Sequence, residues 1–192
     1  MSEARVLVMA GSLRRDSLNH RLATVVAQAL SRRQASVRLL RMSEFPMPVY
    51  DGDLEDRDGL PSGAIALRQA MQAHDAFVFC CPEYNASIPG AFKNALDWVS
   101  RPHAEESGLL PFKQKTVALM SASPGALGGL RSLSHVRAIL SHVGCLVLPD
   151  QFGLPKADQA FDSDGGLLSE RHQQRVDAIT GRLLEVAGAL RA

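Results

Sequence analysis

The sequence predicts a doubly wound α/β domain, in which helices cover both faces of a parallel sheet. Three observations support this fold class. Short apolar runs alternate with segments of helical periodicity along the chain. The runs are apolar at nearly every position, which is typical of strands buried on both faces. The 192 residues suffice for one domain with a substantial core, so we predict a single domain over 1–192 with right-handed crossovers.

Five apolar runs have the character of strands. They cover residues 5–10, 37–42, 76–81, 116–121 and 145–149. The cysteines Cys80, Cys81 and Cys145 lie inside these runs. An odd number of cysteines in apolar segments indicates buried, reduced thiols and a cytoplasmic location.

Five segments between and after these runs have helical spacing of apolar residues. They cover residues 18–33, 62–73, 89–100, 129–142 and 169–190. Pro89 is well placed as a first helical residue. Two long irregular stretches remain, 44–61 and 151–167, and long loops in a compact domain are often functional or involved in assembly. For 151–167, an ordinary surface loop is an equal alternative.

The composition narrows the function. Hydrophobic residues make up 46% and charged residues 21% of the chain, as in ordinary soluble globular proteins. The net charge is +1 with both signs mixed, so nothing favours nucleic acid or a membrane surface as a partner. No apolar run is long enough to span a membrane, and no secretory signal is recognisable. No Cys or His spacing matches a metal site, so we predict none.

The junction between the first strand and the first helix, GSLRRDSLN, is unusually polar. It lacks the glycines of a dinucleotide fingerprint, the GK[ST] of a triphosphate loop and the cysteine of a phosphatase loop. It offers Ser12, Arg14, Ser17 and Asn19 beside the free N–H groups of a helix start. These groups suit a phosphate monoester. The alternative is a simple helix cap by Ser17 or Asn19.

Two further loops should lie at the same edge, because ligands of parallel sheets bind beyond the carboxyl ends of the strands. After the third strand, Pro82, Glu83, Tyr84 and Asn85 form a rigid turn that suits a flat heterocycle. The alternative is a proline-rich turn stabilised by Asn85.

The loop after the fourth strand, SASPGALGGLRS, contains Ser121, Ser123 and several glycines. Glycines permit close approach of the backbone to a ligand, and they equally permit a simple turn. Gly128 and Gly129 are more than a turn strictly needs.

The segments GSLRRDSLNHRLA, PEYNASIPGAFKNALDW and SASPGALGGLRSLSHVRAIL together resemble the NADPH-dependent FMN reductase family. The resemblance runs from about residue 4 to 150, and Phe92 stands where the family pattern has leucine. It implies a flavodoxin-like, five-stranded parallel sheet in the order 2-1-3-4-5 with helices on both faces. It also implies FMN and NADPH (or NADH) as cofactors. The acceptor would be a small molecule such as a quinone, azo compound, chromate or free flavin, and the assembly a homodimer or homotetramer.

The resemblance also implies cofactor contacts at the matching positions. These are Ser12, Arg14, Ser17, Asn19 and the amide of Leu18 for the phosphate, Pro82, Glu83, Tyr84 and Asn85 for the ring and its pyrimidine edge, and Ser121, Ser123 and Gly125 for the ring's other side. No catalytic side chain is predicted, because flavin itself carries the chemistry.

Two other functions remain open from the sequence. One is a non-catalytic FMN protein, either an electron carrier or a redox-sensing module. The near-neutral charge weighs against a carrier that docks electrostatically. The other is a domain that binds a different phosphorylated ligand without redox chemistry.

Overall fold

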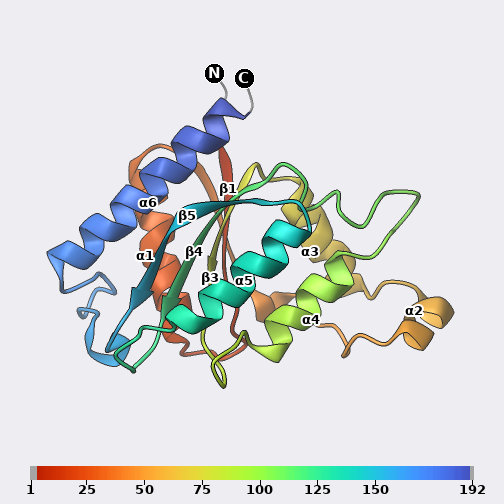
Figure 1. Cartoon of the computed structure of the whole chain (residues 1–192), viewed down its shortest axis with the longest axis horizontal. Coiled ribbons are helices and arrows are strands. Elements are labelled where there is room, and N and C mark those ends of the chain that lie inside the picture. Colours follow the sequence, from red (N-terminus) through yellow and green to blue (C-terminus); the bar gives the residue numbers. More distant parts are fainter. Residues whose placement is uncertain (1–3, 191–192) are drawn as a thin grey trace.

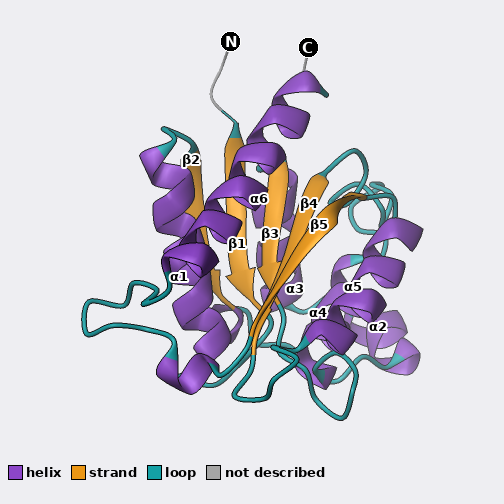
Figure 2. Cartoon of the chain, turned by 60° about the vertical axis from the view of Figure 1, so that its left-hand side comes forward, coloured by secondary structure: helices purple, strands orange, loops and turns teal. Residues whose placement is uncertain are grey.

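The computed structural model describes residues 4–190, so the first three and last two residues of the predicted domain lie outside the described part. Five parallel strands form one sheet in the order β2-β1-β3-β4-β5, which confirms the predicted fold class and strand order. The strands are β1 (Arg5–Ala10), β2 (Ser36–Arg41), β3 (Ala76–Cys80), β4 (Thr116–Ala122) and β5 (Leu146–Leu154). Figure 2 shows their carboxyl ends meeting at one edge, where loops gather.

Helices cover both faces of this sheet (Figures 1 and 2). One face carries α1 (Leu18–Arg32) and α6 (Glu170–Ala189). The other carries α3 (Ser62–Gln72), α4 (Gly90–Val99) and α5 (Leu130–His142). The short helix α2 (Gly52–Asp58) has no buried residue and lies away from the sheet in Figure 1.

Alternation along the strands builds two separate cores. In β1, Val6 and Val8 pack toward α1 and α6, whereas Leu7 and Met9 pack toward α3 and α4. Side chains of a strand point alternately to opposite faces, so a strand covered on both sides must be apolar throughout. This is the reason for the unbroken apolar runs in the sequence.

Two regions differ from the sequence prediction. The last strand was expected over 145–149 but continues to Leu154, so the start of the 151–167 stretch belongs to the sheet. A register shift between Val117 and Leu119 of β4 allows this extension. The 44–61 stretch contains α2 and is not irregular throughout. The other predicted boundaries agree within one or two residues.

The three cysteines are buried and unpaired, as the sequence predicts. Burial raises the pKa of each thiol, so none of them is a ready nucleophile at neutral pH. Over residues 4–190, no helix is both long and apolar enough to cross a bilayer.

Candidate functional site

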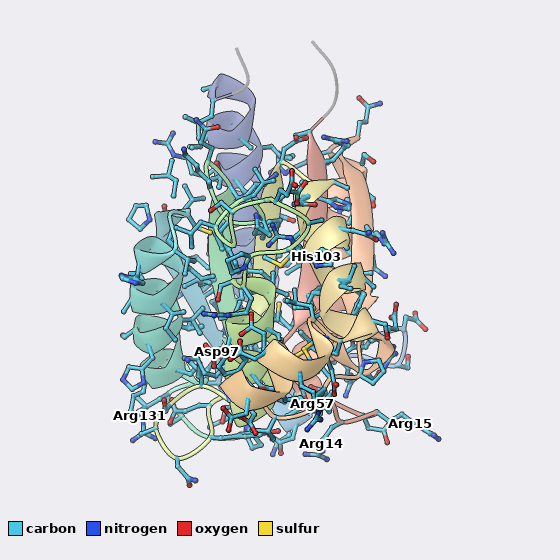
Figure 3. All side chains as sticks on the ribbon, turned by 90° about the vertical axis from the view of Figure 1, so that its right-hand side faces the viewer. Arg14, Arg15, Arg57, Asp97, His103 and Arg131 are labelled. Carbon is cyan, nitrogen blue, oxygen red and sulfur yellow. The ribbon has the colours of Figure 1, made fainter. Side chains whose placement is uncertain are left out.

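The loops after β1, β3 and β4 enclose a cavity of about 130 Å³ at the carboxyl edge of the sheet. Its lining comprises Ser12, Arg14, Ser17, Leu18, Asn19, Pro82, Glu83, Tyr84, Ala122, Ser123 and Pro124. Nine of the twelve predicted site residues therefore surround one cavity. Asn85, Ser121 and Gly125 do not line it. Figure 3 shows Arg14 and Arg131 at this same end of the molecule, with His103 about halfway up the view.

The first loop ends where α1 begins, and Ser17 is the N-cap of this helix. Its backbone is extended, and its Oγ accepts a hydrogen bond from the His20 N–H at 3.4 Å. Among residues 4–190, no acceptor pairs with the backbone N–H groups of Leu18 and Asn19. Such unpaired N–H groups at a helix start attract an anion. Ser17 is thus a cap beside unpaired N–H groups that could bind an anion, so the two sequence interpretations are compatible.

Arg14 brings a positive charge to this cavity. No carboxylate of the described chain pairs with its exposed guanidinium. The Ser12 Oγ accepts a hydrogen bond from the Arg14 N–H at 3.3 Å, which bends the loop at this point. The guanidinium is therefore available to a bound anion.

Asn19 has a structural role that the sequence did not predict. Its carboxamide is buried and pairs with both backbone groups of Ala122 at the end of β4. The Nδ2–H donates to the Ala122 carbonyl at 2.8 Å, and the Ala122 N–H donates to Oδ1 at 2.9 Å. Asn19 therefore ties the first loop to the third. One Nδ2 hydrogen remains, and a contact with phosphate through it stays a prediction.

The second loop forms a tight turn from Tyr84 to Ser87. The N–H groups of these two residues donate to each other's carbonyl groups at 2.9 and 3.0 Å. Asn85 and Ala86 between them have φ of 51° and 63°, in the left-handed region. Asn85 therefore lies exposed at the tip of the turn, outside the cavity. The Tyr84 ring is about half exposed at the rim.

Glu83 holds this loop against α5. Its carboxylate forms an ion pair with Arg131 and also accepts the Arg131 backbone N–H at 3.1 Å. The hydrogen bond from the Arg131 side chain is the main reason that the pKa of Glu83 is lowered. The Glu83 side chain is thus engaged by the protein. Sequence reasoning missed Arg131.

The third loop is shaped by close packing. The Ser121 side chain is fully buried, and its Oγ has no hydrogen-bond partner in residues 4–190. Gly129 has φ of 83°, and a Cβ there would lie 2.0 Å from the Ser121 Oγ. Gly128, with φ of 61°, would place a Cβ 2.5 Å from the Gly153 carbonyl carbon. These contacts explain why both positions are glycine, although a turn alone would not require two glycines.

Ala122 and Pro124, rather than Ser121 and Gly125, join Ser123 in the cavity wall. Sequence reasoning missed both, because neither side chain carries a polar group. The Ser123 Oγ accepts from the Gly125 N–H at 3.2 Å.

The donor set of the cavity fits a phosphate monoester. It combines an unpaired guanidinium, the hydroxyls of Ser12 and Ser17, and unpaired N–H groups at a helix start. The described residues include no group of three or more His, Cys, Asp or Glu side chains that could hold a metal ion.

Comparisons with known proteins identify the family of this chain. The family model described as NADPH-dependent FMN reductase matches residues 4–159. The chain is 31% identical over 186 residues to the quinone reductase of Escherichia coli K12, covering 95% of this chain and 94% of that protein. It is 36% identical over 169 residues to the probable NADPH:quinone oxidoreductase 2 of Oryza sativa subsp. japonica, covering 85% and 79%.

Among solved structures, the chain is similar to the flavoenzyme NAD(P)H:(acceptor) oxidoreductase FerB of Paracoccus denitrificans. The TM-score is 0.80 at 28% identity, over 97% of this chain and 98% of that one. An archaeal flavodoxin, with a TM-score of 0.59 at 7% identity over 98% and 99% of the two chains, shares the fold. The chain therefore belongs to the NADPH-dependent FMN reductase family, and it is an oxidoreductase that uses FMN and a nicotinamide cofactor.

Proposed function

We propose that this protein reduces quinones with NAD(P)H, with FMN held among the three loops at the carboxyl edge of the sheet. The observation that carries the proposal is the cavity in which the unpaired Arg14 guanidinium and the unpaired N–H groups at the start of α1 converge. When bound, FMN supplies the hydride transfer from the nicotinamide to the acceptor. The quinone is suggested by the relatives, which are named quinone reductase and probable NADPH:quinone oxidoreductase 2.

In this proposal the first loop binds the phosphate. Arg14 supplies the charge, and the hydroxyls of Ser12 and Ser17 donate hydrogen bonds. The backbone N–H groups of Leu18 and Asn19 add the field of the α1 terminus. A dianionic phosphate would thereby accept hydrogen bonds from donors that the protein itself leaves unpaired.

The other two loops would border the ring. Pro82, Glu83 and Tyr84 would provide one wall and Ser123 the other. The backbone N–H of Glu83, which pairs with no acceptor among residues 4–190, would stabilise negative charge on the carbonyl edge of the ring. Asn85, Ser121 and Gly125 lie outside the cavity, so the cavity lends no support to their predicted contacts with the cofactor.

The predicted assembly is a homodimer or a homotetramer. Leu127 in the third loop and Leu130 at the start of α5, 55% and 39% exposed, offer apolar surface for a second copy. We place the enzyme in the cytoplasm, because its cysteines are unpaired thiols and its reductant is an intracellular metabolite.

Steady-state turnover tests this function. FMN-loaded protein is mixed with NADPH or NADH and with one acceptor at a time: a quinone, an azo dye, chromate or free FMN. We expect the highest kcat/KM with the quinone. Nicotinamide oxidation no faster with quinone than with dissolved oxygen alone would refute the proposal.

A further inference from the structure

A second cavity, of about 370 Å³, lies beside the cofactor cavity, and the β1–α1 loop borders both. Ser12 and Arg14 line the cofactor cavity, whereas Leu13 between them lines the second one. One short stretch of backbone is therefore a common wall. Gly11 packs against Phe92 at the base of this wall, because a Cβ on Gly11 would lie 3.1 Å from that ring.

The second cavity has an apolar, buried floor. Met42, Phe45 and Leu67 are each less than one-tenth exposed. Leu13 at the rim is 57% exposed, so the cavity opens toward the loop that it shares with the cofactor cavity. The thioethers of Met42 and Met47 can adapt to ligands of different shape.

Small residues of α4 create the space. Ala91 and Ala95, one helical turn apart, present only methyl groups to the cavity. Larger side chains at these positions would fill it.

The polar lining offers little to a charged ligand. The Asn94 carboxamide is held by the protein: its Oδ1 accepts the Tyr50 N–H, and one Nδ2–H donates to the Pro48 carbonyl, both at 2.8 Å, which leaves one Nδ2 hydrogen as a neutral donor. Ser43 is the other polar lining residue, and no charged residue lines the cavity. The lining therefore favours a neutral, apolar ligand over an oxyanion.

We propose that this cavity binds the apolar body of the electron acceptor, that is, the alkyl substituent or second fused ring of a quinone. The proposal rests on the proposed function, and it adds the acceptor class: lipophilic quinones in preference to unsubstituted quinones or chromate. The loop of Pro82 and Tyr84 that would border the ring leads into α4, whose Ala91 lines the second cavity, so an acceptor on the ring would extend past the start of α4 into that cavity. Each methylene buried there is worth about fourfold in affinity.

Filling the cavity tests the proposal. Ala91→Leu adds bulk to the cavity from a position where leucine suits the helix. Ala189→Leu is the matched control, an exposed alanine near the end of α6 on the other face of the sheet. We expect Ala91→Leu to lower kcat/KM for an alkylated naphthoquinone at least about tenfold and for 1,4-benzoquinone less than about twofold. Ala189→Leu should change neither.

A second readout needs no turnover. In FMN-loaded protein with labelled methionine methyl groups, the non-reducible probe 2-naphthol should shift the NMR signals of Met42 and Met47. The signal of Met120, which packs on the other face of the sheet, should not move. These shifts should disappear in Ala91→Leu.

The outcomes separate the two proposals. Equal selectivity in wild type and Ala91→Leu, with no probe-induced shift at Met42 or Met47, would overturn the cavity assignment while quinone turnover remains. If Ala91→Leu changes the assembly mass in light scattering and leaves acceptor selectivity unchanged, the cavity assignment would also be overturned. The cavity would then hold a side chain from a second copy. Probe binding in a wild type that reduces no quinone would overturn the proposed function and leave an apolar ligand site.

Discussion

Replacing Arg14 with alanine tests the phosphate assignment most sharply. In the described chain this guanidinium pairs with no carboxylate, and its side chain is exposed. Its removal should therefore leave the stability of the apoprotein unchanged. A hydrogen bond to a charged group contributes about 1.5–3 kcal/mol. We thus expect FMN to bind about 10- to 150-fold more weakly in Arg14→Ala.

Ser17 gives a contrasting result because it has two roles. Its Oγ caps α1 as well as lining the cavity. Ser17→Ala should destabilise the apoprotein by about 1 kcal/mol through loss of the cap, and should also weaken FMN binding. In the double variant Arg14→Ala/Ser17→Ala, the loss of apoprotein stability should come from the Ser17 substitution, and most of the loss of FMN affinity from the Arg14 substitution.

The assay is a titration of FMN fluorescence with apoprotein, together with thermal unfolding of each variant. Arg14→Lys should be intermediate, because it keeps the charge and loses the planar fork. Arg15→Ala is the control, since Arg15 is exposed and does not line the cavity. Unchanged affinity in a folded Arg14→Ala, or an equal loss in Arg15→Ala, would refute the assignment.

Three further predictions concern the loops around the cavity. The ion pair of Glu83 with Arg131 should stabilise the fold above pH of about 4.3, and this contribution should be lost as pH falls through the lowered pKa of Glu83. Urea unfolding against pH checks this, and Glu83→Gln should flatten that part of the profile. Asn19→Ala leaves two buried backbone groups unpaired and should lower the free energy of unfolding by about 2–4 kcal/mol in urea; a loss under about 1 kcal/mol would contradict the tie. Gly129→Ala should lower the free energy of unfolding by more than about 2 kcal/mol in thermal unfolding, whereas Gly90→Ala, with nothing within 4 Å, should be neutral or stabilising; equal effects would contradict the packing account.

The fold could be predicted largely from local patterns. Strands buried on both faces leave unbroken apolar runs, and Ser17 marks the start of α1. The length of β5 could not be predicted in this way. Pro149 and Asp150 interrupt its apolar run, and the strand continues because β4 pairs with it beyond a register shift. Pairing between distant segments leaves no periodicity in either of them.

The site was predicted as three converging loops, but its internal ties were not. Asn19 and Ala122 are 103 positions apart, and Glu83 and Arg131 are 48 apart. No local pattern reports such contacts. The sequence contained one indication of the ion pair between Glu83 and Arg131. Arg131 lies in the first turn of α5, where a cation is unfavourable unless a carboxylate compensates its charge.

A single anaerobic turnover tests the central claim most directly. FMN-loaded protein is mixed rapidly with equimolar NADPH, and the flavin absorbance is followed before and after addition of an equimolar quinone. The account predicts rapid bleaching by NADPH and full return of the absorbance with quinone, with matching formation of hydroquinone. A spectrum that NADPH leaves unchanged over minutes, or bleaching that quinone does not reverse, would contradict it.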